Sequence, residues 1–179
     1  MSANYCRRGK RTPRSTQAPV VWLASLAALS AWLLLAPTCA AAASPASDPW
    51  AANQVIGPEQ LARELSGPAA QRPLVVCVGF RFLYDSAHIK GAIYQGPARE
   101  PAGLKDLESA AQSWPHEREI VIYCGCCPMG RCPNVRPAFV ALKQMGFAKL
   151  RVLNIPQDFA HDWMDKGYPV EKTLPEKGR

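Results

Sequence analysis

The chain lacks internal repeats, and it has no acidic residue before Asp48. The absence of repeats excludes solenoids and propellers, so 179 residues fit one domain preceded by a leader. Removing residues 1–43 takes away five of the 21 basic residues and none of the 14 acidic ones, which leaves 16 basic residues and a net charge of about +2. The overall charge of +7 is therefore mostly a property of the leader, and it does not favour nucleic-acid binding.

Residues 1–43 have the three parts of a secretory signal. A basic segment contains Arg7, Arg8, Lys10, Arg11 and Arg14. An uncharged apolar run follows over residues 20–36, and small residues then extend from Thr38 to Ala46. We therefore expect a signal peptide and a periplasmic or secreted protein, with an uncleaved membrane anchor as the alternative. Membrane contact would come only through this leader.

The rest of the chain has the pattern of an α/β domain. Short apolar runs at 74–78, 120–123 and 150–155 are typical of buried strands. A helix is expected to open at Pro58, and a second is expected where Val135, Ala138, Phe139 and Leu142 follow helical spacing. Strands that alternate with helices predict a parallel sheet covered on both faces. The flanking segments are expected to be a linker (44–54) and a charged tail (173–179).

A cysteine-rich loop follows the strand expected at 120–123. Four of the seven cysteines fall within nine positions, at Cys124, Cys126, Cys127 and Cys132. If a helix begins near Asn134 or Val135, the N–H groups of its first turn point back at this loop and favour a thiolate. Export would expose these thiols, together with Cys77, to an oxidising compartment. An odd count of five leaves at least one thiol free or paired with another molecule.

Several segments resemble, in the same order and at compatible spacing, the rhodanese family of single-domain sulfurtransferases. The matching segments are residues 74–93, 120–124, 141–153 and 162–170. Within the first segment His88, Ile89, Gly91 and Ala92 match without a gap, and the second resembles the strand that ends on the family's nucleophile. The resemblance implies a single rhodanese-like domain over residues 55–172. It also implies sulfane-sulfur transfer through a cysteine persulfide.

The chain also departs from the family pattern. Cys77, Gly79 and Leu83 stand where the family usually has aspartate, arginine and glutamate, so a buried polar cluster has been removed as a unit. Removing all partners of such a cluster can be nearly neutral for stability. Residues 156–158 replace the usual glycine pair, and the loop after Cys124 is longer and carries three extra cysteines. The substrate class therefore does not follow from the resemblance.

The resemblance favours Cys124 as the nucleophile, with Arg131 nearby to lower its pKa. Cys126, Cys127 and Arg136 are second choices, since Cys126 and Arg131 repeat the family's nucleophile-to-arginine spacing. We expect no cofactor and no resident metal in this interpretation. The expected partners are a small sulfur donor and a thiol acceptor, and His88 is expected to be structural.

Other interpretations use the same cysteines. Residues 124–127 form a C-x-x-C pair, which would make the protein a thiol–disulfide oxidoreductase. Four thiolates also suit a soft ion such as Cu(I) or zinc, although adjacent Cys126 and Cys127 do not easily join one tetrahedral site. Finally, Cys127 and Cys132 could close a short disulfide loop that fixes Arg131 toward Cys124.

Overall fold

The computed structural model describes residues 48–173. The expected signal peptide lies outside these residues, so export stays a prediction. Within the described part of the chain, every helix is too short or too polar to cross a bilayer.

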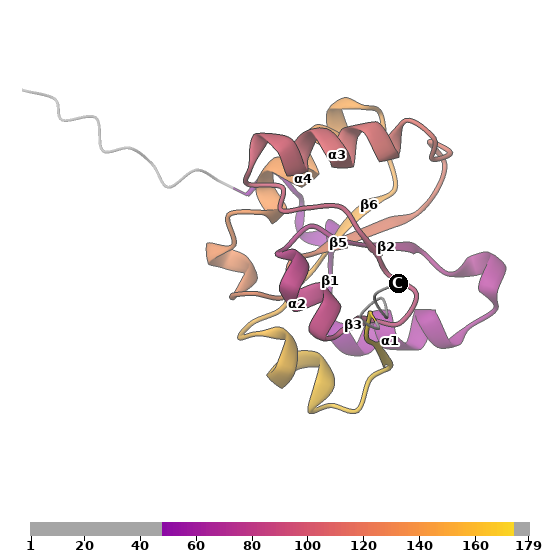
Figure 1. The fold of residues 1–179 in the computed structure, drawn as a ribbon. Helices are drawn as coiled ribbons and strands as arrows, with labels where there is room; N and C mark the ends of the chain where they lie inside the picture. Colours follow the sequence, from indigo (N-terminus) through magenta and orange to yellow (C-terminus); the bar gives the residue numbers. More distant parts are fainter. Residues whose placement is uncertain (1–47, 174–179) are drawn as a thin grey trace, which may run out of the picture. The chain divides into compact units, whose positions relative to one another are not determined.

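A five-stranded sheet forms the centre of the domain, and all its strand pairs are parallel (Figure 1). In spatial order the strands are β1 (Val55–Ile56), β6 (Leu150–Leu153), β5 (Ile120–Tyr123), β2 (Leu74–Cys77) and β4 (Ile93–Tyr94). The three strands expected from the sequence are thus confirmed as the three in the middle. Parallel strands buried on both faces read as continuous apolar runs, which is why these three were recognisable.

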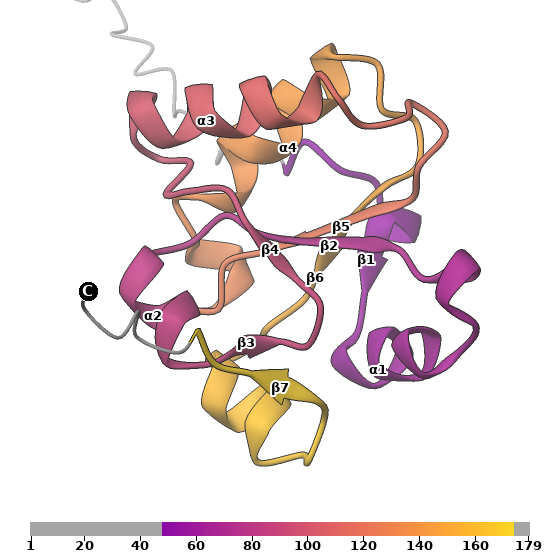
Figure 2. The ribbon, with the colours of Figure 1, turned by 45° about the vertical axis from the view of Figure 1, so that its right-hand side comes forward.

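Helices cover both faces of the sheet, as predicted (Figure 2). One face packs against α3 (Pro101–Ala111) and α4 (Val135–Gln144), and the other against α1 (Pro58–Ser66). The second face also carries α2 (Arg81–Ser86) and a π-helical turn (Ala160–Met164). Alternation along the strands explains this division, because successive side chains of a strand point to opposite faces. A short antiparallel pair, β3 (His88–Ile89) with β7 (Val170–Glu171), closes the domain beside α2.

Part of the expected linker packs onto the domain. Trp50 is buried, and its ring meets Phe139 edge-on with centroids 5.5 Å apart. A 3-10 turn (Ala52–Gln54) follows, and the Gln54 amide donates to the carbonyl of Leu150. These residues add an aromatic side chain and a turn to the domain expected at 55–172.

The fold brings the ends of β2 and β5 together at the cysteine loop. Gly79 follows β2 and lies against Cys124, which follows β5. A Cβ at residue 79 would stand 2.5 Å from the Cys124 carbonyl oxygen and 3.0 Å from its sulfur. The rhodanese pattern has arginine at this position, and here only glycine fits. The missing side chain therefore lets the two strand ends approach closely.

Candidate active site

The loop turns back on itself immediately after Cys124. Gly125 adopts a left-handed conformation (φ 77°), and Phe159 packs where a side chain at residue 125 would begin. The N–H of Phe159 donates to the carbonyl of Gly125, and the N–H of Met129 donates to the carbonyl of Ile155. These contacts hold the loop on the rest of the domain. The turn at Gly125 brings Cys126, rather than Cys127, against Cys124.

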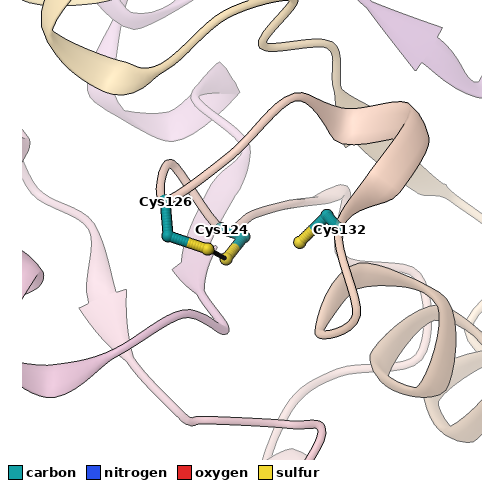
Figure 3. Close-up of side chains that lie close together, drawn as sticks. All are labelled: Cys124, Cys126 and Cys132. Atoms are coloured by element: carbon teal, nitrogen blue, oxygen red, sulfur yellow. Dashed lines mark hydrogen bonds between the residues drawn. The ribbon is translucent and has the colours of Figure 1, made fainter.

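Three sulfur atoms converge inside the loop (Figure 3). The Sγ atoms of Cys124, Cys126 and Cys132 all lie within 4.8 Å of one another, and those of Cys124 and Cys126 are 2.9 Å apart. We call these three residues the thiol triad. Cys127 lies at its edge, with its Sγ 3.3 Å from that of Cys126. All four are free thiols here, so the expected Cys127–Cys132 disulfide stays a prediction.

A buried asparagine holds the triad. The Asn134 side-chain amide donates to the Cys124 sulfur at 3.3 Å, and its carbonyl oxygen accepts the N–H of Arg99 at 3.0 Å. Asn134 is fully buried, as is Cys132, while Cys124 is 5% exposed. Asn134 was not among the candidate site residues predicted from the sequence. A polar residue directly before the helix expected from Val135 was the available signal, because helix starts attract such side chains.

Negative charge in the triad is favoured at Cys132. The pKa of Cys132 lies well below its ordinary value because the thiols of Cys124 and Cys126 donate hydrogen bonds to it, helped by the N–H groups of Asn134 and Val135. The pKa of Cys124 is raised, since its thiol is hydrogen-bonded to Cys126 and Cys132 and is buried. The helix start at Val135 is thus confirmed, but its N–H groups act on Cys132 and not on Cys124.

The two arginines proposed from the sequence lie apart from the sulfurs. Arg131 is exposed, and its guanidinium makes no hydrogen bond or ion pair with another residue in the range 48–173. Arg136 donates to the carbonyls of Cys132 and Gly130 and pairs with Asp48. The structure therefore assigns Arg136 to bracing the loop. A catalytic role for either arginine stays a prediction.

A pocket of about 290 Å³ opens beside two members of the triad. Cys124, Gly125 and Cys126 contribute to its wall, whereas Cys132 does not. Most other lining residues are apolar or aromatic: Leu83, Tyr84, Ala87, Tyr123, Phe159, Ala160 and Met164. Asp158 supplies a carboxylate, and the lining contains no lysine or arginine. Cys77 also lines the pocket, and burial raises its pKa to about 11, so it is a neutral thiol at pH 7.

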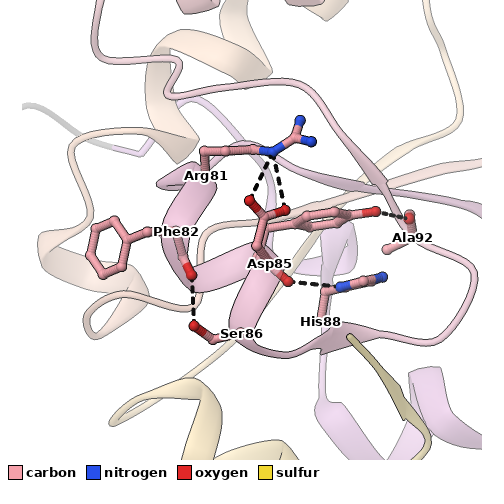
Figure 4. A network of polar contacts seen from close by, with 7 residues as sticks. Arg81, Phe82, Asp85, Ser86, His88 and Ala92 are labelled. Carbon is pink, nitrogen blue, oxygen red and sulfur yellow. Dashed lines mark hydrogen bonds and ion pairs between the residues drawn. The ribbon is translucent and has the colours of Figure 1, made fainter. Parts of the chain in front are cut away.

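The segment around α2 contributes Leu83, Tyr84 and Ser86 to the pocket, and hydrogen bonds among its residues hold this segment in place (Figure 4). Arg81 donates to Asp85, and the Tyr84 hydroxyl donates to the carbonyl of Ala92 at 2.7 Å. His88 is buried, its Nδ1 lies 2.8 Å from the carbonyl oxygen of Tyr84, and its ring stacks on the Tyr84 ring. This is the structural position expected of His88.

No protein-family model matches the sequence, and a search of curated proteins finds no significant relative. Solved structures do match. The crystal structure of the Alr3790 protein from Anabaena sp. is 22% identical with a TM-score of 0.51, covering 68% of this chain and 96% of that one. The BH2092 protein from Bacillus halodurans is also 22% identical with a TM-score of 0.51, covering 69% and 80% of the two chains.

The solution structure of the rhodanese-like domain from the same Anabaena protein is 22% identical, with a TM-score of 0.49, and covers 70% of this chain and 86% of that one. Similarity at this level of identity concerns the fold. The parallel sheet, its helices on both faces and the cysteine after β5 all agree with the resemblance found in the sequence. The chain therefore has the α/β fold of the two crystal structures, which is the rhodanese-like fold expected from the sequence.

Proposed function

We propose that this chain is an exported sulfurtransferase that carries sulfane sulfur as a persulfide on Cys124. The observation that carries the proposal is the position of Cys124. It directly follows β5, lines the pocket, and its sulfur accepts hydrogen bonds from the Asn134 amide and the Cys126 N–H. Donors fixed around a sulfur stabilise the anion that forms when the thiol attacks or leaves.

The reaction needs no cofactor. The Cys124 thiolate attacks the outer sulfur of the donor, the sulfur–sulfur bond of the donor breaks, and a sulfite or sulfinate leaves with the bonding electron pair. An acceptor thiolate then attacks the outer sulfur of the persulfide, and the Cys124 thiolate is released. The thiol proton of Cys124 can pass to the Cys132 sulfur, which carries the negative charge of the triad and accepts a hydrogen bond from Cys124.

The lining of the pocket supports a donor or acceptor with an apolar body. Thiosulfate is a small dianion, and the lining offers it no lysine or arginine, while the one carboxylate of the lining, Asp158, is paired with His161. Leu83, Phe159 and Met164 offer apolar surface to a larger molecule. We therefore propose that thiosulfate is a poorer donor than an aryl thiosulfonate, in which the same type of sulfur–sulfur bond carries an aromatic group.

Intact mass spectrometry tests the proposal. The reduced, metal-free protein is treated with thiosulfate or with benzenethiosulfonate. Its intact mass is then measured before and after addition of a reductant. A gain of one sulfur that reductant removes, absent in Cys124→Ser, supports the proposal. No gain with either donor overturns it. Export is tested separately, by sequencing the N-terminus of the native protein, which is expected to begin between Ala40 and Ala46.

A second function is favoured by the 2.9 Å distance between the Cys124 and Cys126 sulfurs. Two thiols this close can form a disulfide with little movement, which would make the protein a thiol–disulfide oxidoreductase. The sequence pointed to Cys127 as the partner in a C-x-x-C pair, whereas the turn at Gly125 brings Cys126 into contact instead. Loss of two hydrogens, reversed by reductant and mapped to a Cys124–Cys126 link, would favour this function.

A further inference from the structure

We propose that the thiol triad of Cys124, Cys126 and Cys132 is a three-coordinate Cu(I) site. The proposal rests on the convergence of three sulfur atoms from three separate points of the backbone, the end of β5, the turn after Gly125 and the residue two before Asn134. It is independent of sulfur transfer. The sequence counted against a metal site because Cys126 and Cys127 are adjacent, and the structure removes that objection by leaving Cys127 outside the triad.

The number of ligands selects the ion. Among the described residues, the group that can surround one ion consists of these three cysteines. Structural zinc almost always takes four protein ligands, whereas Cu(I) is stable with three thiolates in a plane, and soft thiolate ligands select it. The absence of a histidine or carboxylate from the group also disfavours harder divalent ions.

The spacing of the sulfurs is close to what the ion needs. A metal bound at about 2.3 Å from each of three coplanar sulfurs holds them about 4 Å apart. The sulfurs already lie within 4.8 Å of one another, and the shortest separation, 2.9 Å between Cys124 and Cys126, has to widen. Cys126 is the half-buried member and lines the pocket, so it has room to move. The same pocket offers the ion a way in.

The surroundings balance the charge of a copper–thiolate centre. The Asn134 amide and the Cys126 N–H donate to the Cys124 sulfur, and the N–H groups of Asn134 and Val135 donate to that of Cys132. Asn134 is itself fixed by the Arg99 N–H, as expected of an outer-shell partner that orients a ligand. Two of the three sulfurs are buried, which would shield Cu(I) from oxygen and water.

Anaerobic titration of the reduced protein with Cu(I), in competition with a chromophoric Cu(I) chelator, tests the site. One Cu(I) per chain is expected, and X-ray absorption of that complex should give three sulfur neighbours. A protein that fails to retain Cu(I) against the chelator, or a centre with two or four sulfurs, overturns the proposal. Tighter retention of zinc, added alone, would also overturn it.

Variants locate the ligands. Cys126→Ser and Cys132→Ser are each expected to weaken Cu(I) binding by more than the roughly 10–100-fold that loss of an outer-shell partner costs, and Asn134→Leu should fall within that range. Cys127→Ser is the matched control, one residue from a ligand, and it should bind Cu(I) as tightly as the parent. Equal weakening by Cys127→Ser would overturn the three-ligand site.

Two measurements separate this proposal from the proposed function. Persulfide formation is measured on metal-free protein with chelator present, and Cu(I) binding is measured without any sulfur donor. Failure to bind Cu(I) therefore leaves sulfur transfer untouched, and failure to form a persulfide leaves the copper site untouched. Circular dichroism of each variant confirms that the fold persists, so a lost signal reports a lost ligand.

Discussion

The cysteine loop and the segment around α2, both of which contribute residues to the pocket, use their polar groups in opposite ways. Around α2 each hydrogen-bonding side chain ends on a partner of matching kind: Arg81 on Asp85, the Tyr84 hydroxyl on a carbonyl, and His88 on a carbonyl. In the cysteine loop the thiols end on one another, and Asn134 adds an amide donor to one sulfur. Around α2 the polar groups are fully paired, so they serve to fix the structure. In the cysteine loop the thiols are held only by weak donors, so their sulfurs remain able to react.

The largest expected effect comes from a substitution in the cysteine loop, which tests whether the reactive groups lie there. Cys124→Ser should lower persulfide formation by roughly 10³-fold or more, since loss of a nucleophile removes the covalent step. Cys77→Ser is the matched control, because its sulfur is buried 4.0 Å from the Cys124 carbonyl oxygen and it is a neutral thiol. The measurement is the rate of sulfur gain by mass spectrometry, compared between each variant and the parent protein. Full activity in Cys124→Ser would move the nucleophile to Cys126 or Cys127.

A second effect concerns competition within the loop. One equivalent of Cu(I) should reduce persulfide formation to background, because the copper site and the persulfide use the same Cys124 sulfur. Removing copper with a chelator should restore the rate. A copper-loaded protein that still gains sulfur at the parent rate would contradict one of the two assignments, and peptide mapping of the persulfide would identify which.

Changes around α2 should affect stability and leave the chemistry intact. His88→Ala removes a buried ring that stacks on Tyr84 and bonds to its carbonyl, and it should lower the free energy of unfolding by about 1–3 kcal/mol. Tyr84→Phe loses only the hydroxyl bond to Ala92 and should cost about 1 kcal/mol. Urea unfolding measures both. A loss of sulfur gain in folded His88→Ala would assign the histidine to the reaction.

The smallest expected effect is a pH dependence of stability, and it arises from an ion pair outside both regions. Arg151 donates to Glu64 and lowers the pKa of that carboxyl. A lowered folded pKa means that Glu64 stabilises the fold above its unfolded pKa of about 4.3, and that this contribution disappears as the pH falls through the lower folded value. Stability of Glu64→Gln should therefore approach that of the parent between about pH 5 and pH 3. A constant difference over that range would contradict the ion pair's role.

The sequence predicted the regular parts of the fold well, for physical reasons. The strands that became β2, β5 and β6 are buried on both faces, so their apolar runs are continuous. The start of α4 followed from helical spacing. In contrast α3 was missed. It has only two large apolar residues, Leu104 and Leu107, so its sequence shows a weak helical periodicity. Trp50 was missed because its neighbours are small and polar, and only tertiary packing on Phe139 buries it.

The candidate site was predicted in composition and not in arrangement. Four cysteines after a strand pointed to thiol chemistry at this position. Which sulfurs meet depends on the left-handed turn at Gly125, and no spacing rule states that Cys126 returns to Cys124 while Cys127 does not. The expected approach of Arg131 to Cys124 likewise depended on a loop path that the sequence leaves open. Asn134 depends on the Arg99 N–H, which comes from a distant segment.

The unequal burial of the cysteines determines how the protein will respond to labelling. Between residues 48 and 173 the thiols of Cys77, Cys124 and Cys132 are buried, and those of Cys126 and Cys127 are half-buried. A thiol reagent too large to enter the pocket should therefore react quickly with two cysteines of the folded protein and slowly with three. Its slow phase measures how often the domain opens and does not count reactive groups. A thiol count made with such a reagent on native protein would thus register the two outermost sulfurs and pass over the one after β5, which a donor that fits the pocket can reach.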